Sequence, residues 1–108
     1  MDIADWRKRI DELDQKLVEL LNERAAAALQ IGALKRGKGA PIYEPDREKE
    51  VFNNIHRVNR GPLPERDLTQ IYERLIDVMR KLQRAPGDGT DPKAVRSSGT
   101  EIEAKADE

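Results

Sequence analysis

The sequence has no cysteine, a single histidine and few aromatic side chains: one tryptophan, two tyrosines and one phenylalanine among 108 residues. Without cysteine, a disulfide framework, a thiolate nucleophile and cysteine-ligated zinc are all excluded. His56 alone cannot make the usual histidine-rich metal site or a hydrolytic triad. We therefore expect no metal site, and much of the common catalytic chemistry is ruled out.

An excess of charge of either sign is also missing. The chain carries 20 basic and 21 acidic side chains, which gives a net charge of −1, and its pI is about 5.9. This balance provides no global field to attract nucleic acid or an anionic membrane, so any anion site must be local. The basic run Arg7-Lys8-Arg9 is short and closely followed by acidic residues, so we expect no nucleic-acid partner.

Long apolar runs are missing as well. The longest uncharged stretch before the C-terminal tail, residues 25–34, is far shorter than the roughly 20 residues that span a bilayer. The N-terminus is acidic where a signal peptide would be basic. We expect a cytoplasmic protein without a membrane partner. In residues 85–108 Val95 and Ile102 are the only large apolar groups, so we predict a helical domain in residues 1–84 and a disordered tail.

The most regular feature of the sequence is a heptad pattern in its first third. The pattern runs for about 32 residues without proline and predicts one helix of about 34 residues, about 50 Å long. A compact unit of this size is only roughly 30 Å across. Since such a helix overhangs its own domain, its apolar seam needs a partner, most simply a second copy of the chain. The seam positions are Ile3, Trp6, Ile10, Leu13, Leu17, Leu20, Arg24, Ala27, Ile31 and Leu34.

Two shorter helices are predicted after the first. Pro45 suits a helix start, and Gly61 and Pro62 end the second apolar pattern. Pro64 and the acidic residues after it open a third helix, whose apolar positions repeat the spacing of three and four. No strand-like alternation of useful length is present. The sequence therefore predicts an all-α protein with one very long, one short and one medium helix.

One charged residue stands in the apolar seam. Arg24 lies between Leu20 and Ala27, and burial of an unpaired guanidinium is unfavourable. Arg24 either fixes the register of a coiled coil, pairs with Glu19 or Glu23 on the same helix, or belongs to a binding site.

Further polar side chains favour a binding site. Lys35 follows Arg24 by 11 residues, which places it only about 20° from the same helix face. Arg47 lies on the apolar face of the second helix, and Gln83 follows Met79 by one turn on the third. These four polar groups, three of them cationic, are predicted to point inward. They suit a compact ligand with more than one carboxylate, since guanidinium binds carboxylate through two parallel hydrogen bonds.

Three other polar residues allow different interpretations. Arg7 precedes Arg24 by 17 residues, about 25 Å along and about 100° around the helix, so the two cannot meet within one chain. Arg7 is either solvated or, in an antiparallel pair of long helices, part of the neighbour's cluster. Glu44 is either an acceptor for a ligand hydroxyl or a favourable charge at a helix N-terminus. His56 is expected on the solvated side of the second helix.

The spacing of these residues resembles the all-helical (AroQ-type) chorismate mutases over residues 4 to about 84. The resemblance implies an intertwined helical homodimer with two shared active sites, which converts chorismate to prephenate for phenylalanine and tyrosine synthesis. This intramolecular rearrangement requires no metal, cofactor, nucleophile or proton transfer. The matching segments are Arg7-x2-Ile10-Asp11-x-Leu13-Asp14-x2-Leu17-x2-Leu20-Leu21-x2-Arg24, Ile31-Gly32-x2-Lys35 and Pro41-Ile42-x3-Asp46-Arg47-Glu48.

The resemblance also implies roles for individual residues. Arg7 of one subunit would bind substrate carboxylates together with Arg24 and Arg47 of the other, and Lys35 and Gln83 would bond the ether oxygen. Glu44 would face the ring hydroxyl, Glu48 follows the second arginine as in the family, and Met79 departs from a serine found in some members. The implied catalytic residues are Lys35, Gln83 and Arg24, and the implied substrate-binding residues are Arg7, Arg24, Lys35, Glu44, Arg47, Glu48, Met79 and Gln83.

Two other functions fit the same sequence. An isochorismate-pyruvate lyase would use a similar cationic pocket on the same fold to eliminate pyruvate. A non-enzymatic helical dimerisation module would use Arg24, Lys35 and Arg47 merely to pair with Glu23, Glu48 and their neighbours.

Overall fold

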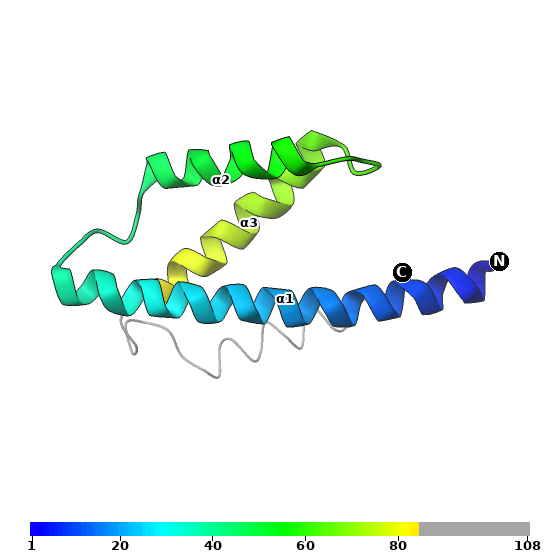
Figure 1. Ribbon diagram of the computed structural model, residues 1–108, viewed down its shortest axis with the longest axis horizontal. Coiled ribbons are helices and arrows are strands. Elements are labelled where there is room, and N and C mark those ends of the chain that lie inside the picture. Colours follow the sequence, from blue (N-terminus) through cyan, green and yellow to red (C-terminus); the bar gives the residue numbers. More distant parts are fainter. Residues whose placement is uncertain (85–108) are drawn as a thin grey trace.

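The computed structural model describes residues 1–84, which form three helices (Figure 1). These are α1 (Ile3–Lys38), α2 (Pro45–Val58) and α3 (Glu65–Gln83). Residues 1–84 contain no β-strand, so the all-α prediction is confirmed. No helix in this part of the chain is both long and apolar enough to cross a membrane. The tail predicted for residues 85–108 lies outside the described residues.

Local capping sets the ends of the long helix. The Asp2 carboxylate accepts a hydrogen bond of 2.9 Å from the backbone N–H of Asp5, and the Asp5 carboxylate accepts one of 3.1 Å from the backbone of Asp2. At the other end Gly39 adopts φ 68°, a left-handed conformation that glycine accommodates without strain. The heptad pattern predicts a helix of about 34 residues. α1 has 36 and ends at Lys38, because Gly39 provides the stop.

The two shorter helices begin where the sequence predicted. Pro45 occupies the first turn of α2, where its missing N–H leaves no helical hydrogen bond unmade. Pro64 precedes α3, and Glu65 and Asp67 place negative charge in the first turn of that helix. Negative charge is favourable there because the first N–H groups of a helix carry partial positive charge.

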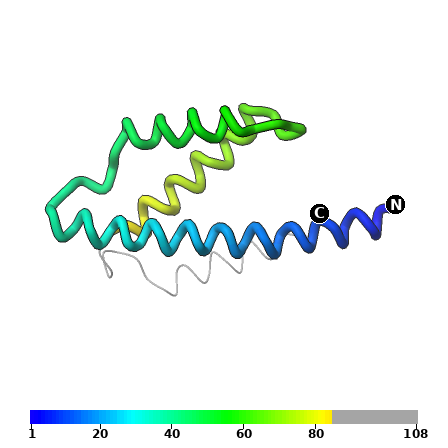
Figure 2. The backbone as a smooth tube through the Cα atoms, in the orientation of Figure 1, coloured from blue at the N-terminus to red at the C-terminus, as the bar shows by residue number. Residues whose placement is uncertain are grey.

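The third helix links the other two. α3 runs diagonally between the other two helices, from the end of α2 to the C-terminal half of α1 (Figure 1). α3 packs against both helices, whereas α1 and α2 do not pack directly on each other. The N-terminal half of α1 projects beyond α2 and α3 (Figure 2). With 36 residues, α1 is about 54 Å long, which equals the longest dimension of the molecule, 54 Å.

Burial is concentrated where α3 meets α1. In residues 1–84 the buried apolar side chains are Ala28, Ile76 and Met79. The seam of α1 is exposed along its length: Trp6 retains 56% of its accessible surface and Leu20 retains 60%. The overhang predicted from the heptad pattern is therefore present. The exposed large apolar residues of the seam are Ile3, Trp6, Ile10, Leu13, Leu17, Leu20, Ile31 and Leu34.

Candidate active site

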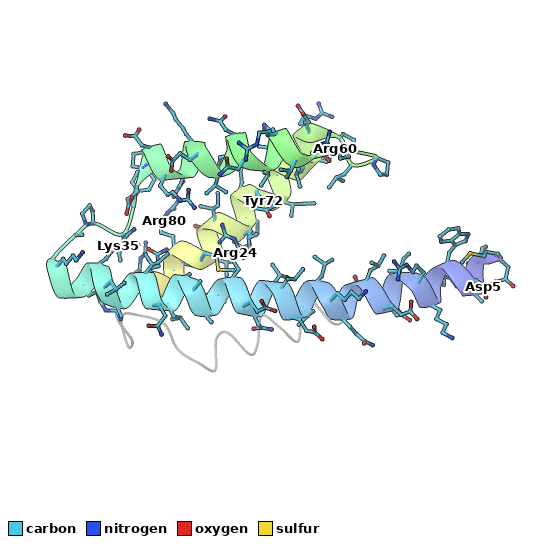
Figure 3. All side chains as sticks on the ribbon, in the orientation of Figure 1. Asp5, Arg24, Lys35, Arg60, Tyr72 and Arg80 are labelled. Carbon is cyan, nitrogen blue, oxygen red and sulfur yellow. The ribbon has the colours of Figure 1, made fainter. Side chains whose placement is uncertain are left out.

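A small pocket of about 80 Å³ opens beside the junction of α3 with α1. Arg24, Lys35 and Arg80 gather around this junction, whereas Asp5 lies far away at the other end of α1 (Figure 3). Side chains from α1, from the segment before α2, from α2 and from α3 thus share one wall. The pocket is lined by Arg24, Ile42, Glu44, Glu48, Ile76, Met79, Arg80 and Gln83.

Lys35 is a largely enclosed cation of the site, with 14% of its side chain exposed. Its Nζ donates to the backbone oxygen of Ile42 at 2.9 Å and to Oε1 of Gln83 at 3.3 Å. It also pairs with Oε1 of Glu44 at 2.7 Å. An ammonium group has three N–H donors, so all of them have partners within the chain. These contacts hold Lys35 in a fixed position at the edge of the pocket.

The amide of Gln83 is oriented by the same contact. An ammonium can only donate, so the Gln83 oxygen faces Lys35 and its NH2 group remains available as a donor toward a ligand. The backbone oxygen of Gln83 accepts a hydrogen bond from Arg36, which ties the end of α3 to α1. Gln83 is therefore fixed both at its backbone and at its side chain.

Gly32 permits the close approach of the two helices. A Cβ atom at this position would lie 2.6 Å from the backbone oxygen of Gln83 and 2.7 Å from its Cα. Such distances are shorter than van der Waals contact, so only glycine fits without a shift of one helix. Gly32 thus sets the position of Gln83 relative to Lys35, which lies one turn further along α1.

Arg24 lines the pocket and is half-buried. None of the ion pairs within residues 1–84 involves it. A guanidinium without a carboxylate partner is suited to bind an anionic group of a ligand. The predicted inward position of Arg24, Lys35 and Gln83 is thus what the structure shows.

Arg47 differs from the sequence prediction. Its side chain is 60% exposed, it pairs with Glu50 at 3.2 Å, and it does not line the pocket. The reason is the helical phase of α2, which turns Glu48 and Phe52 toward α3 and leaves Arg47 about 100° away. Its role in binding a substrate remains a prediction.

The other predicted residues are distributed as follows. Glu44 and Glu48 line the pocket, and Met79 forms part of its buried wall with 6% exposure. Arg7 is exposed in the N-terminal half of α1, about 25 Å along the helix from Arg24.

His56 corrects a further expectation. It is half-buried rather than solvated, and its Nε2 lies 2.7 Å from Oγ1 of Thr69. Thr69 already uses its hydroxyl hydrogen on the backbone oxygen of Glu65, so it accepts the hydrogen bond from His56. Position 56 follows Phe52 by one turn, which places it on the face of α2 that meets α3. His56 therefore joins two helices and does not belong to the pocket.

Sequence reasoning missed Arg80. Its Nη2 and Nε donate to Oε2 of Glu48 at 2.7 and 3.2 Å, and its guanidinium lies over the ring of Tyr43, 5.0 Å from the centroid. A signal was present, because position 80 follows Ile76 by four residues and precedes Gln83 by three, on one face of α3.

Comparison with known proteins identifies the family. A model of the chorismate mutase type II family matches residues 6–84. The bifunctional chorismate mutase/prephenate dehydratase of Aquifex aeolicus is 37% identical, over 77% of this chain and 24% of the relative. The chain therefore spans about a quarter of the length of such relatives. A chorismate mutase of Methanocaldococcus jannaschii is 31% identical, over 76% of this chain and 84% of the relative.

A solved structure gives the same picture. The crystal structure of chorismate mutase from Helicobacter pylori in complex with prephenate superposes with a TM-score of 0.69 and 33% sequence identity. The alignment covers 75% of this chain and 88% of that chain. With a family model that covers most of its length and with three helices arranged as in this relative, the chain belongs to the chorismate mutase type II family.

Proposed function

We propose that the chain is a chorismate mutase, which rearranges chorismate to prephenate in the pocket beside α1 and α3. The observation that carries this proposal is the contact between Lys35 and Gln83 next to the unpaired guanidinium of Arg24. Membership of the chorismate mutase type II family supports the same substrate.

The reaction suits a site that contains donors and no nucleophile. Within one molecule, the C–O bond of the ether breaks while a new C–C bond forms, and negative charge grows on the ether oxygen. Fixed donors that point at this oxygen stabilise the transition state more than the ground state. Lys35 and the Gln83 NH2 group are such donors, and each contributes roughly 3 kcal/mol.

Substrate binding requires an exchange of partners at Lys35. Its three donors are engaged within the chain, so the ether oxygen replaces one of the acceptors. Glu44 is the acceptor that leaves, because its side chain is 47% exposed and can be solvated. The released carboxylate is then solvated, which leaves the ring hydroxyl to another acceptor. Lys35 can thus bind the ether oxygen while it keeps its contacts with Ile42 and Gln83.

The carboxylates of chorismate require further cations. Arg24 supplies one of them. Arg47 supplies another after its exposed pair with Glu50 is exchanged, since such surface pairs contribute only about 0 to 1 kcal/mol. Met79 contributes an apolar wall where some members of the family place a serine.

A second copy of the chain completes the proposed site. The exposed seam of α1 needs an apolar partner of the same length, and an antiparallel copy of α1 provides one. In this arrangement Arg7 of the projecting half lies beside the C-terminal half of the other α1. Each pocket then receives Arg7 of the partner subunit as its third guanidinium.

A turnover assay tests the proposal. The purified chain is incubated with chorismate, and loss of chorismate and appearance of prephenate are followed by absorbance and chromatography. Prephenate as the product supports the proposal. Salicylate and pyruvate from isochorismate, without prephenate from chorismate, would indicate the lyase instead. A dimer that turns over neither compound would be a dimerisation module.

A further inference from the structure

Arg80 and Glu48 form a second polar pair at the pocket, apart from the one at Lys35. The pair joins α3 to the first turn of α2 and is half-buried, with 28% of Arg80 and 24% of Glu48 exposed. Tyr43 supports the guanidinium from the segment between α1 and α2. A cation above an aromatic ring is attracted by the negative face of the ring. Arg80 is thus held on two sides.

The two hydrogen bonds of this pair end on the same oxygen. Nε and Nη2 of Arg80 both donate to Oε2 of Glu48. Oε1 therefore has no donor among residues 1–84, although the residue lines the pocket. A carboxylate fixed through one oxygen presents the other as an acceptor in a defined direction.

The charge of Arg80 matters as well. Chorismate carries two carboxylates, and an unpaired Glu48 in the same pocket would repel them. Asp77 lies 3.8 Å from Nη1 of Arg80, so its contact is longer than the 2.7 Å contact with Glu48. Arg80 therefore acts chiefly on Glu48 and offsets the charge of that carboxylate.

We propose that Arg80 is a positioning residue that fixes Glu48 with Oε1 directed at the ring hydroxyl of the substrate. This inference rests on the proposed function. It gives the two carboxylates of the site different roles. Glu44 is paired with Lys35, whereas Oε1 of Glu48 is free to accept a hydrogen bond. The hydroxyl is not a reacting group, so its contact is equally strong before and in the transition state. Loss of such a contact raises KM and leaves kcat nearly unchanged.

A double-mutant cycle separates this role from direct binding of a carboxylate by Arg80. We expect R80Q and E48Q each to lower kcat/KM roughly tenfold to a hundredfold, mainly through KM. In the E48Q background, R80Q should change kcat/KM by less than about twofold, because Arg80 acts through Glu48. An equally large loss in both backgrounds would overturn the proposal, since Arg80 would then bind substrate itself. R74Q removes an exposed arginine of the same helix and serves as the matched control.

If R80Q does not fold, a variant of Tyr43 and a substrate analogue test the role of Arg80. Tyr43→Leu alters an exposed side chain and should lower kcat/KM roughly twofold to fivefold through KM. A chorismate analogue with hydrogen in place of the ring hydroxyl should be bound equally well by the wild-type chain and this variant. If the variant loses as much with the analogue as with chorismate, the proposal is wrong. Absence of wild-type turnover would instead overturn the proposed function, which distinguishes the two failures.

Discussion

Replacement of Gly32 by alanine places a methyl group between α1 and α3. The new Cβ would lie 2.6 Å from the backbone oxygen of Gln83, whereas ordinary van der Waals contacts begin at 3.4 Å. The end of α3 therefore has to shift by roughly 0.8 Å, the difference between these distances. A misplacement of about 1 Å at a reacting centre can reduce the rate about 100-fold. We expect kcat to fall roughly tenfold to a hundredfold.

The same substitution should change stability much less than activity. Overpacking destabilises by about 1 to 3 kcal/mol. Alanine in place of glycine inside a helix stabilises by roughly 0.5 to 1 kcal/mol and offsets part of this loss. The free energy of unfolding should fall by about 0 to 2.5 kcal/mol, measured by urea denaturation.

Gly37→Ala is the matched control. It lies in the same helix, and a Cβ there would meet no atom within 4 Å. This variant should keep wild-type kinetics and gain slightly in stability. Steady-state kinetics of both variants check the argument. Wild-type kcat and KM in Gly32→Ala would refute the claim that this contact sets the position of Gln83.

Three further predictions address the catalytic cation, the shared site and the dimer. Lys35→Ala should lower kcat about 100-fold with normal helicity, because its charge acts on the developing oxyanion; the exposed Lys38→Ala is the kinetic control. Refolding Arg7→Ala and Arg24→Ala chains together should restore about a quarter of wild-type activity, because about half the dimers are mixed and each has one intact site. Persistent inactivity of mixed dimers seen by native mass spectrometry would exclude a shared site. Leu17→Glu places a charge in the seam and should shift sedimentation toward monomers; an unchanged dimer would place the interface elsewhere.

The helices were predictable because the signals that define them are local. Periodicity gave the extent of the apolar patterns, and prolines gave the starts of α2 and α3. Periodicity does not decide whether Gly37 or Gly39 ends α1, because glycine inside a helix is tolerated and only the left-handed conformation of Gly39 stops it. Conformation at one residue is not visible in a sequence pattern.

The site was predictable in part. Arg24 and Lys35 share one helix, so helical phase alone places them together. Arg47 does not line the pocket of the single chain, because the phase of α2 depends on how it packs against α3, where Glu48 and not Arg47 meets Arg80. Arg80 was missed for the same reason. Periodicity indicates the direction of a side chain on its own helix, and the crossing of two helices decides which side chain it meets.

The small core of the single chain has a consequence for how the protein responds to dilution. Ala28, Ile76 and Met79 are the only buried apolar side chains in residues 1–84. Ordering the backbone opposes folding by roughly 1–2 kcal/mol per residue, and so few buried groups cannot offset this over three helices. In the proposed dimer the seam supplies the missing burial, so folding and association form one bimolecular equilibrium. The melting temperature then rises with protein concentration, and dilution abolishes turnover by unfolding the chain and not by releasing active monomers.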